Sequence, residues 1–88
     1  MVLPRADVLV RVRTLLEVRL QLGTGDGPIG ESSGLLGEGI GLDSVEVLQL
    51  VAAAEEAFDI TVADDELLPE HFQTVGTFVD FIEARLRA

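Results

Sequence analysis

Gly41-Leu42-Asp43-Ser44-Val45 is the stretch that decides how this chain folds, because a glycine-rich segment ends there and an apolar-periodic run begins. In that run, apolar residues recur at the spacing of one helix face. The residues on this face are Val47, Leu50, Val51, Ala54 and Phe58. The sequence therefore predicts a helix from Ser44 to Phe58. The Ser44 hydroxyl is expected to be exposed at the positive end of the helix dipole, with Asp43 beside it.

This stretch and its helix resemble the phosphopantetheine-attachment region of acyl carrier proteins. The helix reads Glu46-Val47-Leu48-Gln49-Leu50 near its start and Glu55-Glu56-Ala57-Phe58 at its end. The family usually reads Gly-x-Asp-Ser-Leu, followed by an amphipathic helix that ends in Glu-Glu-x-Phe. Val45 therefore departs from the commoner leucine. The resemblance is clear over residues 40–86, weaker over the first predicted helix and weak in the loop between them.

The resemblance implies a function for Ser44. This residue would receive a covalent 4'-phosphopantetheine arm from coenzyme A, transferred by a phosphopantetheinyl transferase that recognises Asp43. The thiol of the arm would carry acyl intermediates as thioesters for fatty-acid, polyketide or related specialised biosynthesis. The chain would thus be a carrier with no catalytic residue of its own.

The outer face of the same helix carries a modest apolar strip between acidic side chains. An ordinary solvated surface is one interpretation of such a face. The resemblance favours a docking surface for acyl-loading, condensing or acyl-transfer enzymes with basic patches, on which acids steer the encounter and apolar contacts fix the register. The residues of this predicted docking face are Val45, Glu46, Leu48, Gln49, Ala52, Glu55 and Glu56.

Other interpretations of Ser44 remain open. A serine before a helix is most often only an N-cap, which would make the chain a small acidic adaptor. An aminoacyl or peptidyl carrier of a nonribosomal or cell-envelope pathway would share the fold and the arm, although such carriers more often read Gly-Gly-x-Ser. A catalytic serine would need an adjacent base. The single histidine is His71, and the chain has no G-x-S-x-G elbow, so a hydrolase is disfavoured.

Length and charge narrow the class of protein. The 88 residues predict a single acyl-carrier-like domain spanning residues 1–88, too small for a large enclosed active site. The formal net charge is −10, lysine is absent, and no arginine lies between Leu20 and Ala84. This acidic middle is expected to repel nucleic acid and anionic membranes and to attract basic patches on proteins.

Composition also bears on compartment and metal binding. No apolar stretch approaches the roughly 20 residues of a membrane span, and Met1-Val2-Leu3-Pro4-Arg5 does not have the form of a signal peptide. We therefore expect a cytoplasmic monomer without membrane insertion. The chain has no cysteine, and its paired acids lack the spacing of a calcium-binding loop, so no metal site is predicted.

The first part of the chain is less clearly patterned. Residues 4–22 contain alternating valines typical of a strand, but Leu9, Val12 and Leu16 keep helical spacing. We favour a helix because the segment is long for a strand and because Pro4 suits a helix start.

Residues 23–42 contain eight of the nine glycines and predict a long loop, most mobile over 24–33. The apolar residues expected to anchor it are Ile29, Leu35, Leu36, Ile40 and Leu42. Gly25-Asp26-Gly27-Pro28-Ile29-Gly30 matches the dinucleotide-binding pattern G-x-G-x-x-G. We reject this match, since a proline interrupts it and the chain has no room for the accompanying sheet.

The last third predicts a connector and a final helix. Asp64 and Asp65 suit the start of a short helix, which Pro69 interrupts, although residues 69–72 can form a second turn. Residues 74–87 keep helical spacing, with Thr74 as the cap. The predicted fold class is therefore all-α, a bundle of three main helices plus one short helix. Its expected core is Leu9, Val12, Leu16, Leu50, Val51, Ala54, Phe58, Phe72, Phe78, Val79 and Ile82.

Overall fold

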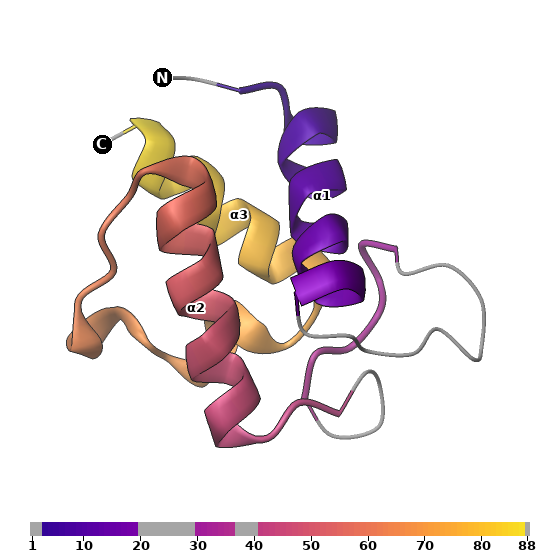
Figure 1. Cartoon of the computed structure of the whole chain (residues 1–88), viewed down its shortest axis with the longest axis vertical. Coiled ribbons are helices and arrows are strands. Elements are labelled where there is room, and N and C mark those ends of the chain that lie inside the picture. The colour runs from indigo at the N-terminus through magenta and orange to yellow at the C-terminus, as the bar shows by residue number, and fades with distance from the viewer. Residues whose placement is uncertain (1–2, 20–29, 37–40, 88) are drawn as a thin grey trace.

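The computed structural model describes residues 3–19, 30–36 and 41–87, and the side chains of Val18 and Arg19 are not included in the description. It contains three α-helices: α1 (Arg5–Thr14), α2 (Ser44–Phe58) and α3 (Val75–Arg87). A π-helical turn, η1 (Leu15–Arg19), extends α1. Two 3₁₀ turns, η2 (Asp64–Glu66) and η3 (Pro69–Phe72), connect α2 to α3 (Figure 1).

The predicted all-α fold is confirmed. The connector holds two short turns, since Pro69 begins a new turn after η2 ends. The first segment is helical over residues 5–19, as we favoured, and residues 20–22 lie outside the described part of the chain. Outside the helices, the described residues include an isolated antiparallel bridge between Gly34 and Thr74.

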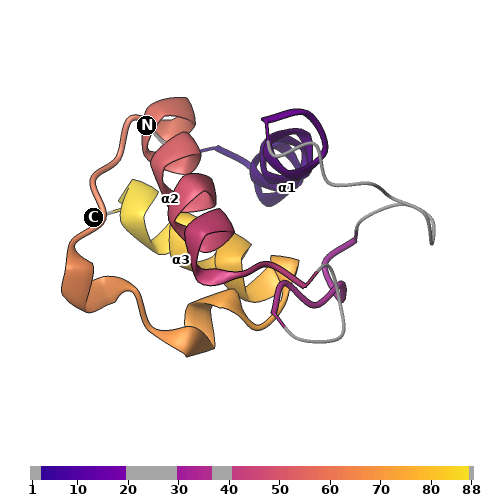
Figure 2. The same cartoon turned by 60° about the horizontal axis from the view of Figure 1, so that its bottom comes forward.

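The helices form a bundle in which α1 packs on α3, and α2 contacts the η1 turn. The start of α1 and the end of α3 lie at one end of the molecule, and the start of α2 lies at the opposite end (Figure 1). The connector with η2 and η3 runs along the side of the bundle away from α1 (Figure 2). Ser44 therefore lies at the end of the bundle opposite to the start of α1 and the end of α3.

The core contains ten of the eleven residues predicted for it. The exception is Leu9, which is only half-buried, and Val8 takes its place with no exposed surface. The apolar face of the first helix thus runs through Val8, Val12 and Leu15–Leu16, so Val12 and Leu16 are buried as predicted and only Leu9 is replaced. Val10 belongs to the alternating valines but lies on the outer side of the helix, where it is 55% exposed.

A row of aromatic rings links η3 to α3. The ring centroids of Phe72 and Phe78 are 5.5 Å apart, and those of Phe78 and Phe81 are 6.5 Å apart. His71 stacks on Phe81 at 4.5 Å, which accounts for the half-buried position of the single histidine. These contacts fix η3 against α3.

The segment of residues 30–36, which we call the strap, crosses the start of α3. The N–H of Gly76 donates to the carbonyl of Glu31 at 2.8 Å, and the N–H of Val75 donates to the carbonyl of Ser33 at 2.9 Å. The strap therefore supplies partners for orphan N–H groups at a helix N-terminus. Of the region predicted to be most mobile, residues 24–29 lie outside the described residues, whereas residues 30–33 are tied to α3 in this way.

The strap also reaches the start of α2. Leu35 is fully buried, and its carbonyl accepts the N–H of Leu42, itself buried, at 2.8 Å. Both leucines anchor the loop as predicted. Leu36 is exposed, and the other two predicted anchors, Ile29 and Ile40, lie outside the described residues.

Two arginines join non-helical segments to the helices. Arg5 donates hydrogen bonds to Glu31 of the strap and to Asp80 and Glu83 of α3. The hydrogen bond to Glu31 first, and then that to Asp80, raises the pKa of Arg5 above its ordinary value. Arg85 of α3 bonds to Glu66 of η2 at 3.0 Å. Arg5 thus ties the strap, which precedes α2, to α3, and Arg85 ties η2, which follows α2, to the same helix.

Candidate functional site at the start of α2

The start of α2 is capped by Asp43. The Asp43 carboxylate accepts the N–H of Glu46 at 2.8 Å, and the Glu46 carboxylate accepts the N–H of Asp43 at 3.1 Å. This reciprocal pair is a capping box. Gly41, with a φ of 76°, provides the left-handed turn that leads the chain into it. The structure therefore assigns the N-cap to Asp43, and the interpretation of Ser44 as a cap is wrong.

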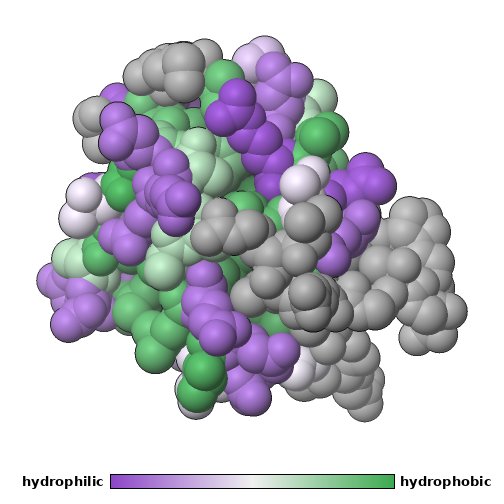
Figure 3. Space-filling view, viewed as in Figure 1, coloured by the Kyte–Doolittle hydropathy of each residue, from purple (hydrophilic) through white to green (hydrophobic). Residues whose placement is uncertain are grey.

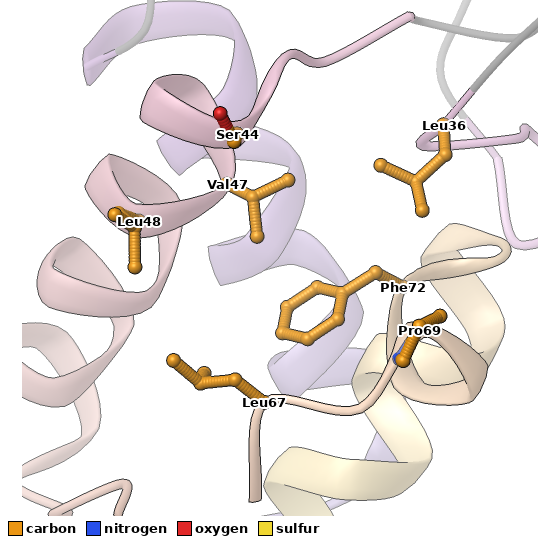
Figure 4. A pocket seen from close by; sticks show the side chains of 7 residues that line it. All are labelled: Leu36, Ser44, Val47, Leu48, Leu67, Pro69 and Phe72. Atoms are coloured by element: carbon orange, nitrogen blue, oxygen red, sulfur yellow. The ribbon is translucent and has the colours of Figure 1, made fainter. Parts of the chain in front are cut away.

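Ser44 is the first residue of α2, and its side chain is exposed. Among the residues that the structure describes, none forms a hydrogen bond with its hydroxyl. Figure 4 shows the hydroxyl oxygen directed away from Phe72, at the edge of the first helical turn. The hydroxyl is thus accessible to an external enzyme, at the end of the helix where partial positive charge is concentrated.

An apolar groove of about 380 Å³ opens beside Ser44. Val47 and Leu48 of α2 form one side, and residues from the strap and the connector form the other (Figure 4). Apart from Ser44, every residue in the lining is apolar. The lining consists of Leu36, Ser44, Val47, Leu48, Leu67, Pro69 and Phe72.

The sequence did not single out Leu36, Leu67 and Pro69 as site residues. Their apolar character was the available signal, but other apolar residues of the connector and the loop, such as Val62 and Leu35, share it. Conversely, the alanines of α2 do not line this groove: Ala53 and Ala54 are buried in close helix packing, and Ala52 is exposed.

The predicted docking face lies on the outside of α2. Val45 and Leu48 are 61% and 55% exposed, and Gln49, Ala52 and Glu56 are exposed as well. Their positions repeat at helical spacing, so they form one stripe. In the space-filling view, apolar surface gathers over and beside the N-terminal half of α2, with hydrophilic residues on either side (Figure 3).

Two acids of this face have structural partners. Glu46 belongs to the capping box, and Glu55 accepts the N–H of Val62 at 2.8 Å, which ties the connector to the end of α2. Both are half-buried. Their charges still contribute to the acidic field over α2, but their side chains are held in place by the fold.

The groups needed for serine hydrolysis do not meet at Ser44. His71 stacks on Phe81 and is not part of the groove lining, and the lining contains no titratable side chain. Across residues 3–19, 30–36 and 41–87, no three histidine or carboxylate side chains converge in a group that could hold a metal ion. The geometry at Ser44 fits a site of modification by another enzyme.

Comparison with known proteins agrees with this geometry. The family model described as "Phosphopantetheine attachment site" matches residues 10–82. An acyl carrier protein of Phenylobacterium zucineum is 41% identical over 83 residues, which cover 94% of this chain and 99% of that protein. The chain belongs to the acyl carrier protein family. The family assignment made from the residues around Ser44 is therefore confirmed.

Further relatives extend the match. An acyl carrier protein of Caulobacter vibrioides strain NA1000 / CB15N is 39% identical over 77 residues, covering 88% of this chain and 92% of that protein. The solution structure of a holo acyl carrier protein from Nitrosomonas europaea aligns with a TM-score of 0.60 and 34% identity, covering 96% of this chain and 93% of that one.

Family membership fixes the general role. Acyl carrier proteins are carriers and not catalysts, and their cofactor is a covalently attached 4'-phosphopantetheine. The family interacts with phosphopantetheinyl transferases and with biosynthetic enzymes. The described helices are also all too short or too polar to cross a membrane.

Proposed function

We propose that Ser44 carries the 4'-phosphopantetheine arm and that the chain shuttles acyl groups in fatty-acid, polyketide or related specialised biosynthesis. The observation that carries this proposal is the exposed Ser44 hydroxyl at the rim of an apolar groove. Asp43 caps the helix, so the Ser44 hydroxyl is not needed for capping. When attached, the arm supplies a terminal thiol that holds acyl groups as thioesters. The chain itself has no cysteine, so this sulfur would be its only thiol.

The attachment step needs only the hydroxyl from this chain. Ser44 Oγ attacks the phosphorus of coenzyme A that bears the pantetheine group, forming a new phosphodiester bond. The hydroxyl proton passes to the modifying phosphopantetheinyl transferase, and 3',5'-adenosine bisphosphate leaves. The new phosphodiester charge lies at the start of α2, where the dipole and free N–H groups favour an anion. Asp43 holds that first turn in shape and serves as a recognition residue for the transferase.

The groove provides space for the cargo. Ser44 lies at its edge, and the remaining lining is apolar, so an acyl chain returning along the arm would remove hydrocarbon surface from water. An aminoacyl cargo would bring a charged amine into the same lining without a partner, which is unfavourable. The apolar lining thus supports an acyl cargo over an aminoacyl or peptidyl one.

The outer stripe of α2 is the proposed docking face for partner enzymes. Val45 and Leu48 offer exposed apolar contacts beside Ser44, and the net charge of −10 attracts basic patches from a distance. Repulsion between like charges also disfavours self-association of the chain. We therefore propose that residues 1–88 act as one monomeric carrier domain in the cytoplasm.

Intact mass spectrometry tests the attachment site. The chain is incubated with coenzyme A and a phosphopantetheinyl transferase of broad specificity, and we expect a gain in mass of one phosphopantetheine arm. Ser44→Ala should gain nothing. The matched control is Ser32→Ala, which removes another exposed serine hydroxyl and should still gain one arm. The proposed site would be refuted if Ser44→Ala gained an arm, or if the unaltered chain gained none.

A loading assay separates the two kinds of carrier. The holo protein is offered either acyl-coenzyme A with an acyltransferase or amino acids with ATP and an adenylating enzyme. Acyl loading alone supports the proposal. Efficient loading by amino acids alone would assign the chain to the aminoacyl carriers.

A further inference from the structure

One wall of the groove belongs to no α-helix. Leu67 follows η2 and Pro69 begins η3, and both face Val47 and Leu48 of α2 across the groove (Figure 4). A wall of this kind moves more easily than a helix, because few hydrogen bonds within it resist a displacement. The width of the groove therefore depends on what fixes this part of the connector to the bundle.

Packing of Leu67 against the core contributes to this attachment, and the Arg85 guanidinium provides hydrogen bonds to α3. Its Nη1 donates to Glu66 Oε2 at 3.0 Å, and its Nη2 donates to the carbonyl of Thr61 at 3.0 Å. The Nε of the same side chain is buried without a hydrogen-bond partner among the described residues. Arg85 thus lies along the surface of the connector and reaches two points on it, one on each side of the start of η2.

Glu66 transmits the attachment to the wall. Its Oε2 accepts from Arg85, while its Oε1 accepts the N–H of Ala63 at 3.0 Å and so closes the η2 turn. The N–H of Leu68 in turn donates to the carbonyl of Glu66 at 2.9 Å. Leu67 lies between these bonded residues. A displacement of Leu67 away from α2 therefore strains the bonds that Glu66 makes.

Within the described part of the chain, Arg85 makes every hydrogen bond and ion pair that joins residues 60–68 to α3. This segment is also attached to α2, through Glu55, and to η3, where the N–H of His71 donates to the carbonyl of Leu68 at 3.0 Å. The side chains of Arg85 and Glu66 are only 34% and 28% exposed, so solvent screens their attraction less than it does for a fully exposed pair.

We propose that the ion pair between Arg85 and Glu66 sets the width of the groove and thereby selects the size of the acyl group that it shelters. This inference rests on the proposed function, since it assumes that the cargo is tethered at Ser44. Arg85 and Glu66 do not touch the groove themselves. They are positioning residues that act through Leu67. With the pair intact the wall stays close to α2, and without it Leu67 moves outward and longer chains fit.

The first test compares acyl groups of different length on four variants. Arg85→Met keeps the aliphatic stem and removes the donors, and Glu66→Gln keeps the volume and removes the charge. The double variant tests coupling. Arg87→Met is the matched control, because it removes an equal charge from the same last turn, where Arg87 is exposed. Each holo protein is loaded with butyryl, octanoyl or dodecanoyl groups, and the half-life of the thioester in hydroxylamine is measured.

We expect both single variants to shift the best-protected acyl group to a longer chain than in the unaltered protein. The double variant should shift it no further, and Arg87→Met should leave it unchanged. A merely destabilised protein would lose protection for all lengths together, without a shift in preference. Identical length preferences in all the proteins would overturn the proposal.

The second test does not involve the arm. Amide hydrogen exchange at Leu67 and Leu68 in the unmodified protein should be faster by up to about fivefold in Arg85→Met and Glu66→Gln, the factor that a pair of this exposure supports. Equal rates in all variants would overturn the role of the pair whatever happens at Ser44. Failure of the unaltered chain to accept an arm would instead refute the proposed function, which separates the two failures.

Discussion

Asp43 and Glu46 cap each other across the first turn of α2, with their side chains and N–H groups bonded reciprocally at 2.8 and 3.1 Å. Ser44 lies between them and takes no part. The capping that a serine often performs is therefore done by its neighbour, and the hydroxyl remains accessible. The reactive group and the group that stabilises the helix are adjacent but separate.

The first prediction concerns this division between Asp43 and Ser44. Asp43→Ala removes the cap and should lower the free energy of unfolding by about 1 kcal/mol. Asp43→Asn keeps an oxygen acceptor, so its stability should stay within a few tenths of a kcal/mol of the unaltered chain. Urea denaturation measures both. A stable Asp43→Asn variant that accepts the arm slowly would show that the transferase recognises the carboxylate. A normal rate of arm transfer would show that Asp43 acts only as the helix cap.

The second prediction concerns Ser44 itself. Ser44→Ala should retain the helical circular-dichroism signal and lie within about 0.5 kcal/mol of the unaltered stability, because the side chain is exposed and bonded to no described residue. An unfolded Ser44→Ala variant would show that the hydroxyl supports the fold and would contradict the capping geometry.

Most of the fold was predictable because local patterns and the global structure agree. The spacing of Val47, Leu50 and Val51 gave the correct face of α2, and Pro69 correctly divided the connector. On α1, Val12 and Leu16 were predicted correctly, but Leu9 was wrong, because Val8 and Leu9 are both apolar and only tertiary packing decides which of them is buried. Local spacing carries no information on that choice.

The third prediction concerns Arg5. Three carboxylates, on the strap and on α3, surround this guanidinium. Arg5→Met should lower the free energy of unfolding by about 1–2 kcal/mol at low salt, and by less in molar salt, since the group is partly exposed and each such pair contributes about 1 kcal/mol or less. Arg87→Met, which removes an equal charge, is the control and should have little effect.

The pH dependence of this contribution follows from the raised pKa of Arg5. A pKa that is higher in the folded state gives stability that is complete below the ordinary arginine value. That stability is lost only as the pH rises through the higher folded-state value. The difference in stability between the unaltered chain and Arg5→Met should therefore be constant from neutral to moderately alkaline pH. A difference that vanished in this range would contradict the arrangement.

The fourth prediction concerns the strap. An alanine usually improves a helix position occupied by glycine by up to about 1 kcal/mol. At Gly76, however, an added Cβ would lie 3.1 Å from the Glu31 carbonyl oxygen, which is held by its bond to Gly76. We expect Gly76→Ala to lower the melting temperature. Gly30→Ala is the control, because its Cβ would meet nothing within 4 Å. A higher melting temperature for Gly76→Ala would mean that the strap moves away from the added Cβ at little cost in free energy.

The fifth prediction concerns the acidic middle of the chain. With a net charge of −10, self-repulsion should weaken the compact state, so sodium chloride or magnesium chloride should raise the melting temperature. Differential scanning fluorimetry over a salt series measures this effect. A flat response would indicate that the carboxylates are spaced too widely to repel one another strongly.

The site was predictable in part. The motif around Ser44 and the apolar spacing on α2 located the hydroxyl and the outer stripe. The groove was not predictable, because Leu36, Leu67 and Pro69 come from segments without periodicity and meet α2 only through tertiary contacts. The same holds for Glu46 and Glu55, whose charges were read from the sequence but whose structural partners were not.

The row of rings from Phe72 to His71 gives the protein an internal spectroscopic sensor. Phe72 lines the groove, and the row ends at the single imidazole of the chain, stacked on Phe81. A cargo that tilts Phe72 and shifts the rings packed behind it would change the ring-current shielding at the imidazole protons, whose resonances no second histidine overlaps. Tryptophan and tyrosine are absent, so few other aromatic resonances would obscure this signal in a one-dimensional NMR spectrum.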